Sequence, residues 1–150
     1  MFIIRQALPS DLHIIASFQI KMAMETENLK LDLNTVTKGV EAVFNDSYKG
    51  KYYVAEADNI VVACLLTTYE WSDWRNGTIL WIQSLYVEKG FRKKGIFKAM
   101  FNHIKEIVTT NDTLKGIRLY VDKSNLIAVN VYKSLGMNNQ HYSLFEWMKD

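Results

Sequence analysis

Residues 85–97 combine an apolar run, a group of cations and a glycine in an order that suits an anion. The segment reads Leu85-Tyr86-Val87-Glu88-Lys89-Gly90-Phe91-Arg92-Lys93-Lys94-Gly95-Ile96-Phe97. The apolar run ends at Val87, and an amphipathic helix is predicted to begin near Gly95. The N–H groups of a first helical turn have no partners inside the helix, and the helix dipole adds partial positive charge there. The order of strand, basic loop and helix start therefore predicts a site for a pyrophosphate-bearing cofactor.

Other phosphate-binding motifs do not fit this loop. No Gly-Lys-Ser/Thr follows, as the phosphate loop of nucleoside triphosphatases requires. A dinucleotide fingerprint needs more glycines at fixed spacing than the loop supplies. A run of charges by itself is more often a solvated surface. A second motif lies further along the chain and supports the cofactor interpretation: Asn125-x-x-Ala128-x-x-x-Tyr132-x-x-x-Gly136-Met137.

Together the two motifs resemble the GNAT superfamily, the Gcn5-related N-acetyltransferases. The first family motif, Arg/Gln-x-x-Gly-x-Gly/Ala after a strand, is nearly matched by Arg92-x-x-Gly95-x-Phe97. The second, a helix reading Asn-x-x-Ala-x-x-x-Tyr-x-x-x-Gly-Phe, is nearly matched by residues 125–137. The order of predicted elements also matches over most of the chain. Phe97 departs from the pattern, because a small residue usually stands there and allows the phosphate a closer approach.

The resemblance implies acetyl-CoA as the cofactor and a role for each matching residue. Residues 92–97 would cradle its pyrophosphate with backbone amides. The strand end at Leu85, Tyr86 and Val87 would supply backbone contacts to the pantetheine arm, and Asn125 would contact the same arm. Tyr132 would act as general acid toward the departing thiolate. Backbone amides of the strand would polarise the thioester carbonyl as negative charge develops.

Two of these residues also have simpler interpretations. Tyr132 lies in an apolar helical pattern, so its ring could serve only as a core aromatic with a satisfied hydroxyl. Asn125 could serve only as the N-cap of the helix that it precedes. The capping and ligand roles of Asn125 are compatible with each other.

The acceptor side of the site is less well defined by the sequence. Many family members place a carboxylate on the fourth strand to take the amine proton, but residues 78–87 contain no Asp or Glu, and Trp81 and Gln83 occupy the middle of this run. A free alkyl amine is mostly protonated at neutral pH, so a route for its proton is needed. The candidates for the base are ordered water or an acidic side chain: Glu25, Glu27, Glu70 or Asp73. Trp74 and Trp81, with neighbouring aromatic residues, could form an acceptor pocket or a dimer surface.

The elements that must position these residues follow from periodicity and turn signals. Strands are predicted at residues 2–7, 51–57, 59–68, 78–87, 117–121 and 141–148. Helices are predicted at residues 12–24, from about 35 to 44, from about 95 to 111, and at 128–135 with Gly136 as the C-cap. The predicted order is β-α-α-β-β-β-α-β-α-β. It is typical of an α+β fold with a mixed, mostly antiparallel sheet flanked by helices.

Composition excludes several other classes of function. The chain has 150 residues and 49% hydrophobic content, which predicts one domain spanning residues 1–150. A net charge of +2 is too small to indicate general nucleic-acid binding. The single cysteine, Cys64, lies in an apolar run and is predicted to be a buried structural thiol, and the three histidines lack the spacing of metal ligands. No run approaches the length of a membrane span, and no signal pattern is evident, so a cytoplasmic protein is expected.

These inferences predict an N-acetyltransferase in which a primary amine attacks the bound thioester of acetyl-CoA directly. A small-molecule amine is the expected acceptor, and a homodimer is one of the expected assemblies. Two alternatives stay open. One is a non-catalytic module that binds or senses acyl-CoA, and the other is an enzyme that acetylates the N-terminus or a lysine of a protein.

Overall fold

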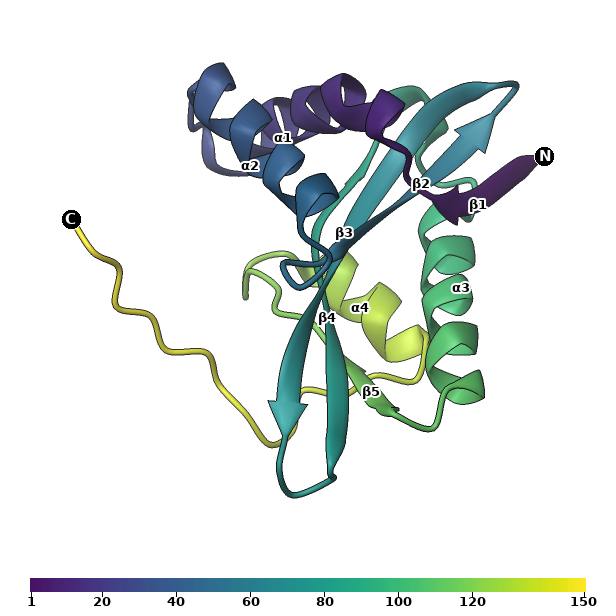
Figure 1. The fold of residues 1–150 in the computed structure, drawn as a ribbon, viewed down its shortest axis with the longest axis vertical. Helices are drawn as coiled ribbons and strands as arrows, with labels where there is room; N and C mark the ends of the chain where they lie inside the picture. Colours follow the sequence, from purple (N-terminus) through teal and green to yellow (C-terminus); the bar gives the residue numbers. More distant parts are fainter. The chain divides into compact units, whose positions relative to one another are not determined.

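A computed structural model describes residues 1–150 and divides the chain into two compact units, Met1–Arg118 and Leu119–Asp150 (Figure 1). The first unit contains five strands, three α-helices and two short 3-10 helices: β1 (Phe2–Gln6), η1 (Pro9–Asp11), α1 (Leu12–Glu27), α2 (Leu33–Asn45), β2 (Lys51–Ala57), β3 (Ile60–Ser72), β4 (Gly77–Val87), η2 (Lys89–Phe91), α3 (Ile96–Thr110) and β5 (Leu114–Arg118). The second unit contains α4 (Leu126–Ser134).

The five strands form one sheet in the order β1-β2-β3-β4-β5. The first three pairs are antiparallel and the β4–β5 pair is parallel. Asp58 and Asn59 both have positive φ, 50° and 63°, and they make the tight turn between β2 and β3. The mixed, mostly antiparallel sheet with flanking helices confirms the predicted α+β class.

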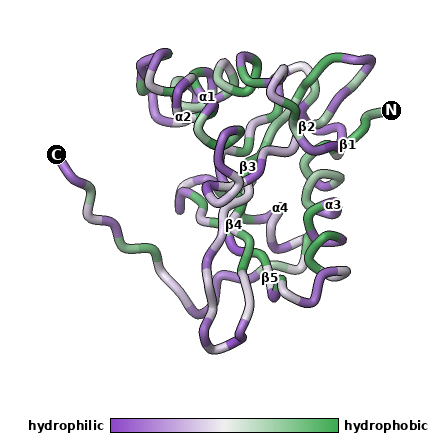
Figure 2. The backbone as a smooth tube through the Cα atoms, in the orientation of Figure 1, coloured by the Kyte–Doolittle hydropathy of each residue, from purple (hydrophilic) through white to green (hydrophobic).

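Helices of the first unit pack on both faces of the sheet (Figure 1). α1 and α2 pack together on one face, over a buried cluster that includes Phe18, Val40, Tyr52, Val54, Cys64 and Tyr86. α3 lies on the other face, where the ring of His103 meets the ring of Tyr53 at 5.6 Å. Polar and apolar residues alternate along α3 in Figure 2, and its buried side includes Ile96, Met100, Phe101 and Ile104.

Cys64 is fully buried in the α1 face of the sheet. The amide nitrogen of Gln19 lies 3.5 Å from its sulfur, and burial raises the pKa of the thiol to about 12. A thiol in this state is a poor nucleophile. Cys64 therefore has the structural role that the sequence predicts.

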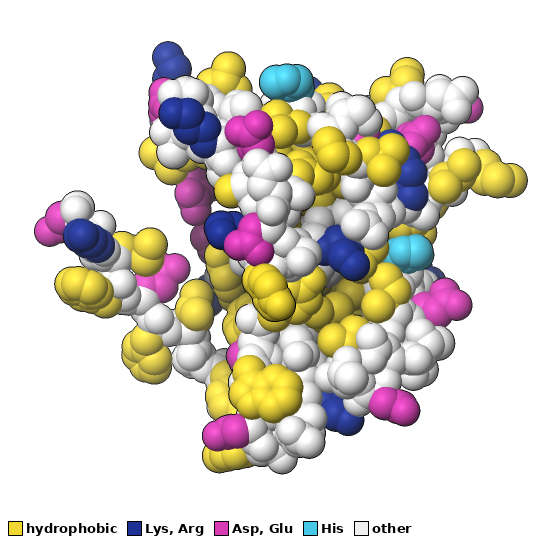
Figure 3. Space-filling view, viewed as in Figure 1, with side chains coloured by type: hydrophobic (Ala, Val, Ile, Leu, Met, Phe, Trp, Pro, Cys, Tyr) yellow, Lys and Arg dark blue, Asp and Glu magenta, His cyan; other side chains and the backbone are white.

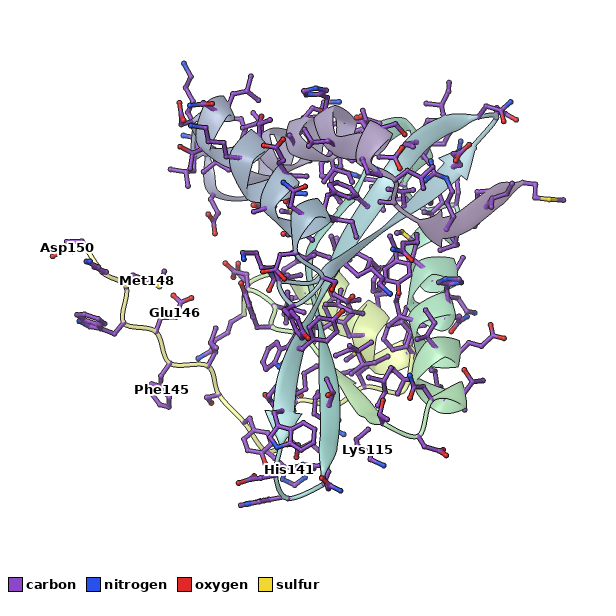
Figure 4. All side chains as sticks on the ribbon, in the orientation of Figure 1. Lys115, His141, Phe145, Glu146, Met148 and Asp150 are labelled. Atoms are coloured by element: carbon purple, nitrogen blue, oxygen red, sulfur yellow. The ribbon has the colours of Figure 1, made fainter.

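Most element bounds shift by one to four residues from the sequence predictions, and three differences concern the sheet. β3 continues to Ser72 because β4 pairs with it from Ala63 to Ser72. β5 is Leu114–Arg118 and not residues 117–121, because its register with β4 begins at Thr78 opposite Leu114. The predicted strand at residues 141–148 does not form: the second unit has no other strand, and a strand needs a partner for its backbone. Phe145 and Met148 project from this extended segment, and both are exposed (Figure 4).

Candidate functional site

Gly95 starts α3 at the end of the basic loop, as predicted. It has a left-handed backbone, with φ of 81°, and no side chain caps the helix that follows. By contrast, Asp32 caps α2 through a 2.8 Å bond to the amide of Thr35. An uncapped first turn with a glycine at the N-cap presents amide donors and a positive dipole end to a ligand.

Three cations of the loop directly precede this helix start in the sequence. The residues before Gly95 are Arg92, Lys93 and Lys94, and all three are exposed to solvent. Lys93 also has a positive φ of 62°. The ammonium group of Lys94 lies 5.1 Å from the centre of the Phe91 ring. Elsewhere the charges are mixed, since basic and acidic side chains are interspersed on the face in Figure 3. The helix start and its two lysines suit an anionic ligand of small size.

The last part of β4 extends past its parallel partner. The pairing of β4 with β5 ends at Trp81 opposite Arg118, whereas β4 itself continues to Val87. Within the first unit no strand pairs with this side of β4 beyond Trp81. An extended strand with an edge of this kind offers backbone donors and acceptors to an extended ligand. Leu85 and Val87 lie in this part of β4, as the sequence predicts.

A β-bulge interrupts β4 just before its end. Leu66 pairs with Gln83 and Cys64 pairs with Tyr86, so β4 has one residue more than β3 between these pairs. Ser84, within this interval, has a φ of 54°. A bulge changes which face the following side chains occupy. Tyr86 therefore lies on the same face as Gln83, three positions earlier, and is buried against the ring of Phe18 at 5.1 Å.

Glu25, one of the predicted candidates for a base, lies beside the basic loop. Its carboxylate accepts hydrogen bonds from Arg92 at 2.7 Å and from the hydroxyl of Tyr86 at 3.0 Å. The bond from Arg92 holds the pKa of Glu25 below its ordinary value. Burial and the bond to Glu25 raise the pKa of Tyr86 to about 12, so this phenol stays a donor. A carboxylate held in this way is a weak base at neutral pH.

Because the pKa of Glu25 is lowered by folding, we expect its contribution to stability to depend on pH. A carboxyl of this kind stabilises the folded protein above its unfolded pKa of about 4.5 and loses this effect as pH falls through the lower folded pKa. The free energy of unfolding of Glu25→Gln should fall below that of the wild type by about 0.2–1 kcal/mol at pH 7. Urea denaturation from pH 7 to pH 3 should show this difference shrinking below about pH 4.5. A difference that is constant with pH would contradict the assignment.

Glu70 belongs to a second cluster. Its carboxylate accepts a 3.1 Å bond from the indole nitrogen of Trp81 and pairs with Arg118. The three residues stand on adjacent strands, β3, β4 and β5. Glu70 and Trp81 were both predicted on the acceptor side, and the structure brings them together. The sequence motifs could not identify Arg118, because it lies outside both residues 92–97 and residues 125–137.

The remaining acceptor candidates are dispersed. Asp73 and Trp74 lie in the turn between β3 and β4, where the carboxylate of Asp73 accepts a 2.9 Å bond from the amide of Trp74. Trp74 is 88% exposed, so it lines no core. Gln83 is partly buried in β4, and Glu27 is exposed at the last residue of α1. The structure therefore does not gather the seven acceptor-side candidates into one group.

Asn125 and Tyr132 belong to α4 in the second unit. The side chain of Asn125 caps the helix by accepting a 3.1 Å bond from the amide of Ala128, so the simpler interpretation of this residue holds. Gly136, with φ of 87°, follows the helix as predicted. Tyr132 is partly buried and lines an apolar hollow of the second unit together with residues that include Val121, Val129 and Met137. Burial raises the pKa of Tyr132, so its hydroxyl is protonated at neutral pH.

The chain has neither a metal-binding cluster nor a membrane-spanning helix. No three His, Cys, Asp or Glu side chains gather where a metal ion could be held. No helix has the length and apolar character needed to cross a membrane.

The fold is α+β, with an uncapped helix start after a basic loop and an unpaired strand end, and comparison with known proteins names its family. The sequence model described as the acetyltransferase (GNAT) family matches residues 22–137. Because this range is most of the chain, the protein belongs to the GNAT acetyltransferase family, whose members use acetyl-CoA. This confirms the resemblance inferred from the two motifs.

Solved structures agree with the family assignment. The crystal structure of a possible acetyltransferase from Clostridium difficile 630 is 47% identical over 100% of this chain and 99% of that chain, with a TM-score of 0.93. A predicted acetyltransferase with acetyl-CoA from Clostridium acetobutylicum is 19% identical, with coverage of 99% and 95% and a TM-score of 0.74. A ribosomal-protein-alanine N-acetyltransferase from Brucella melitensis biovar Abortus 2308 is 14% identical, with full coverage of both chains and a TM-score of 0.81. The last two show likeness of fold alone. No curated protein matches the sequence.

Proposed function

We propose that this protein transfers the acetyl group of acetyl-CoA to a primary amine, which attacks the thioester directly. The start of α3 is the observation that carries the proposal. Gly95 leaves the first turn without a side-chain cap, and Lys93 and Lys94 stand beside it. This arrangement suits the pyrophosphate of a coenzyme A molecule.

Residues in each unit have the chemistry to hold a part of acetyl-CoA. The amides of the first turn of α3, with Lys93 and Lys94, would hold the pyrophosphate. The end of β4 from Leu85 to Val87 would supply backbone contacts to the pantetheine arm, because β5 does not pair with β4 beyond Trp81. Asn125 caps α4 through its side-chain oxygen, which leaves its NH2 group as a donor for the same arm. When bound, acetyl-CoA supplies an acetyl group on a thiol that can leave.

Tyr132 would protonate the departing thiolate. Burial raises the pKa of its phenol, so the hydroxyl carries its proton at neutral pH and is available as an acid. Glu25 and Glu70 are both held by arginines, and we therefore propose that water accepts the amine proton. Since the motif residues are divided between the two units, we also propose that residues 1–150 work as one acetyltransferase domain.

Two measurements test the proposed activity. Calorimetric titration of the full chain with acetyl-CoA should show binding, and thiol release should appear when a panel of primary amines is added. A chain that gives no binding heat would overturn the proposal. Thiol release with small amines, but not with peptides of free N-terminus or lysine, would support a small-molecule acceptor. The reverse preference would favour a protein-directed enzyme.

A non-catalytic acyl-CoA-binding module is the second candidate. It is favoured by the acceptor side, where β4 carries no carboxylate and both Glu25 and Glu70 are engaged with arginines. Such a module would bind acetyl-CoA in the titration but release no thiol above the rate without protein. The same two measurements therefore separate the two candidates.

Gly95→Val is expected to weaken acetyl-CoA binding by about tenfold or more, because a β-branched residue at positive φ costs about 1–3 kcal/mol and would displace the helix start. The cost would arise from the backbone, since a Cβ at Gly95 would have no atom within 4 Å apart from those of the adjacent residues. Gly95→Asn is the matched control, because asparagine tolerates the left-handed conformation. Calorimetry should give similar dissociation constants for acetyl-CoA in the wild type and Gly95→Asn, and a larger one in Gly95→Val. Equal affinities of the asparagine and valine variants would contradict this account.

A further inference from the structure

Three ion pairs join α1 to the start of the basic loop: a long one between Lys89 and Glu25 at 3.7 Å, and two shorter ones of opposite polarity. Lys21 of α1 pairs with Glu88 at 2.6 Å, and Glu25 of α1 pairs with Arg92 at 2.7 Å. The members of each element are four residues apart, Lys21 with Glu25 on α1 and Glu88 with Arg92 in the loop. We call these four residues the α1 clasp. The repeated spacing gives the loop one electrostatically favoured register on the helix.

The guanidinium group of Arg92 is engaged by protein atoms on several sides. Its Nη2 donates to Glu25, and its Nε donates to the carbonyl of Val87 at 2.8 Å. Its central carbon lies 5.3 Å from the centre of the Tyr86 ring. These contacts connect the loop to α1 and to the last residues of β4. The two hydrogen bonds use two of the five N–H donors of Arg92 and hold its guanidinium group against α1 and the end of β4.

Tyr86 completes the arrangement because the bulge in β4 turns it toward α1. Its hydroxyl donates to Oε1 of Glu25 while Arg92 donates to Oε2, so both carboxylate oxygens are used. Strict alternation from Gln83 would place Tyr86 on the opposite face, away from α1. The bulge thus allows Tyr86 to bind the same carboxylate that Arg92 binds, that of Glu25.

We propose that Arg92 is a positioning residue that holds the basic loop on α1, and that it is not a ligand of the cofactor pyrophosphate. The inference rests on the proposed function, since it concerns how that site receives acetyl-CoA. The phosphate charge is then met by the start of α3 and by Lys93 and Lys94. The clasp determines where this helix start and the end of β4 stand relative to each other, through Arg92 and Val87.

The Arg92–Glu25 ion pair is partly exposed to solvent, so substitution of either residue should leave the protein folded. The side chains of Arg92 and Glu25 are 41% and 23% exposed. Pairs of this exposure contribute little to folding. Neutral variants therefore fold, and an effect on cofactor binding is not caused by loss of the folded protein.

The test is a double-variant cycle on the full chain with coenzyme A as the probe. Glu25→Gln and Arg92→Gln should each weaken binding by about tenfold, and the double variant should be no weaker than either single variant, because both remove one shared contact. Lys38→Gln and Glu41→Gln, at exposed positions of α2, are the matched controls and should bind as the wild type does. Arg92→Lys should restore part of the affinity, since lysine can still pair with Glu25.

Two results would overturn the proposal. If Arg92→Gln weakens binding while Glu25→Gln leaves it unchanged or tightens it, Arg92 contacts the phosphates directly. If neither variant changes the affinity, the clasp has no part in the site.

Hydrogen–deuterium exchange of the protein without cofactor separates failure of this inference from failure of the proposed function. Peptides that cover residues 88–95 should exchange several-fold faster in Glu25→Gln and Arg92→Gln than in the wild type and the α2 controls. If the wild type binds no coenzyme A but the exchange rises as expected, the proposed function fails and the clasp stands. Unchanged exchange would refute the clasp whatever the protein binds.

Discussion

Tyr132→Phe is expected to lower the turnover of acetyl transfer by about 100-fold, the lower part of the range for loss of a general acid. The phenol of Tyr132 keeps its proton at neutral pH because burial raises its pKa, so the wild-type residue is in the form that can donate. Phenylalanine keeps the ring and its packing in the apolar hollow of the second unit and removes only the hydroxyl. The affinity for acetyl-CoA should therefore change by less than about twofold, since the hydroxyl acts when the thiolate leaves.

The measurement is steady-state kinetics with the best amine of the panel, together with calorimetric titration of acetyl-CoA. Tyr48→Phe, at an exposed position between α2 and β2, is the control and should leave both quantities unchanged. An unchanged turnover in Tyr132→Phe would remove this residue as the acid. A parallel loss of turnover and affinity would assign it to binding or packing.

The basic loop and the start of α3 could be predicted because their signals are local in the sequence. Gly95 is the residue that a helix start with a left-handed backbone needs, and the run of cations before it is visible without a structure. The hairpin at Asp58 and Asn59 is equally local, since both residue types tolerate positive φ. Such features depend on a few adjacent residues, and the structure confirms where they lie.

Features that depend on distant partners could not be predicted in the same way. Serine at position 84 gives no sign of a bulge, which appears only when the register against β3 is known. The position of β5 was wrong by three residues, because pairing with β4 and not the apolar run at 117–121 decides it. The strand expected at 141–148 was wrong because its aromatic and apolar residues say nothing about whether a neighbouring strand is present.

The α1 clasp is an intermediate case. Lys21 and Glu25 have the spacing of one helical face, and Glu88 and Arg92 repeat this spacing with the charges reversed. The complementary pattern was therefore present in the sequence, but nothing local showed that α1 and the loop meet. Glu25 was predicted as a base for the acceptor side, whereas its contacts assign it to the donor loop. The role of Glu25 therefore depends on its hydrogen-bond partners, Arg92 and Tyr86, which the sequence does not reveal.

Phe18→Ala is expected to lower the free energy of unfolding by about 3–5 kcal/mol, which is a large share of the stability of an ordinary domain. Phe18 is fully buried on the α1 face of the sheet, and its ring lies 5.1 Å from that of Tyr86. Removal of the ring would leave a cavity between α1 and the end of β4, where neighbouring side chains are fixed by the bulge and by the hydrogen bond to Glu25. These constraints limit collapse into the space, and the cost of such a substitution grows with the cavity that remains.

Urea denaturation of the full chain measures this loss, and Phe145→Ala provides the matched control. Phe145 is the same residue type at 93% exposure in the C-terminal segment, so its truncation should change the free energy of unfolding by less than about 0.5 kcal/mol. Comparable losses in the two variants would show that Phe145 is packed in solution, and would contradict the exposure of the C-terminal segment. A small loss in Phe18→Ala would instead show that α1 can close over the space. The position of α1 would then be less strongly determined by its core than by the ion pairs that join it to the basic loop.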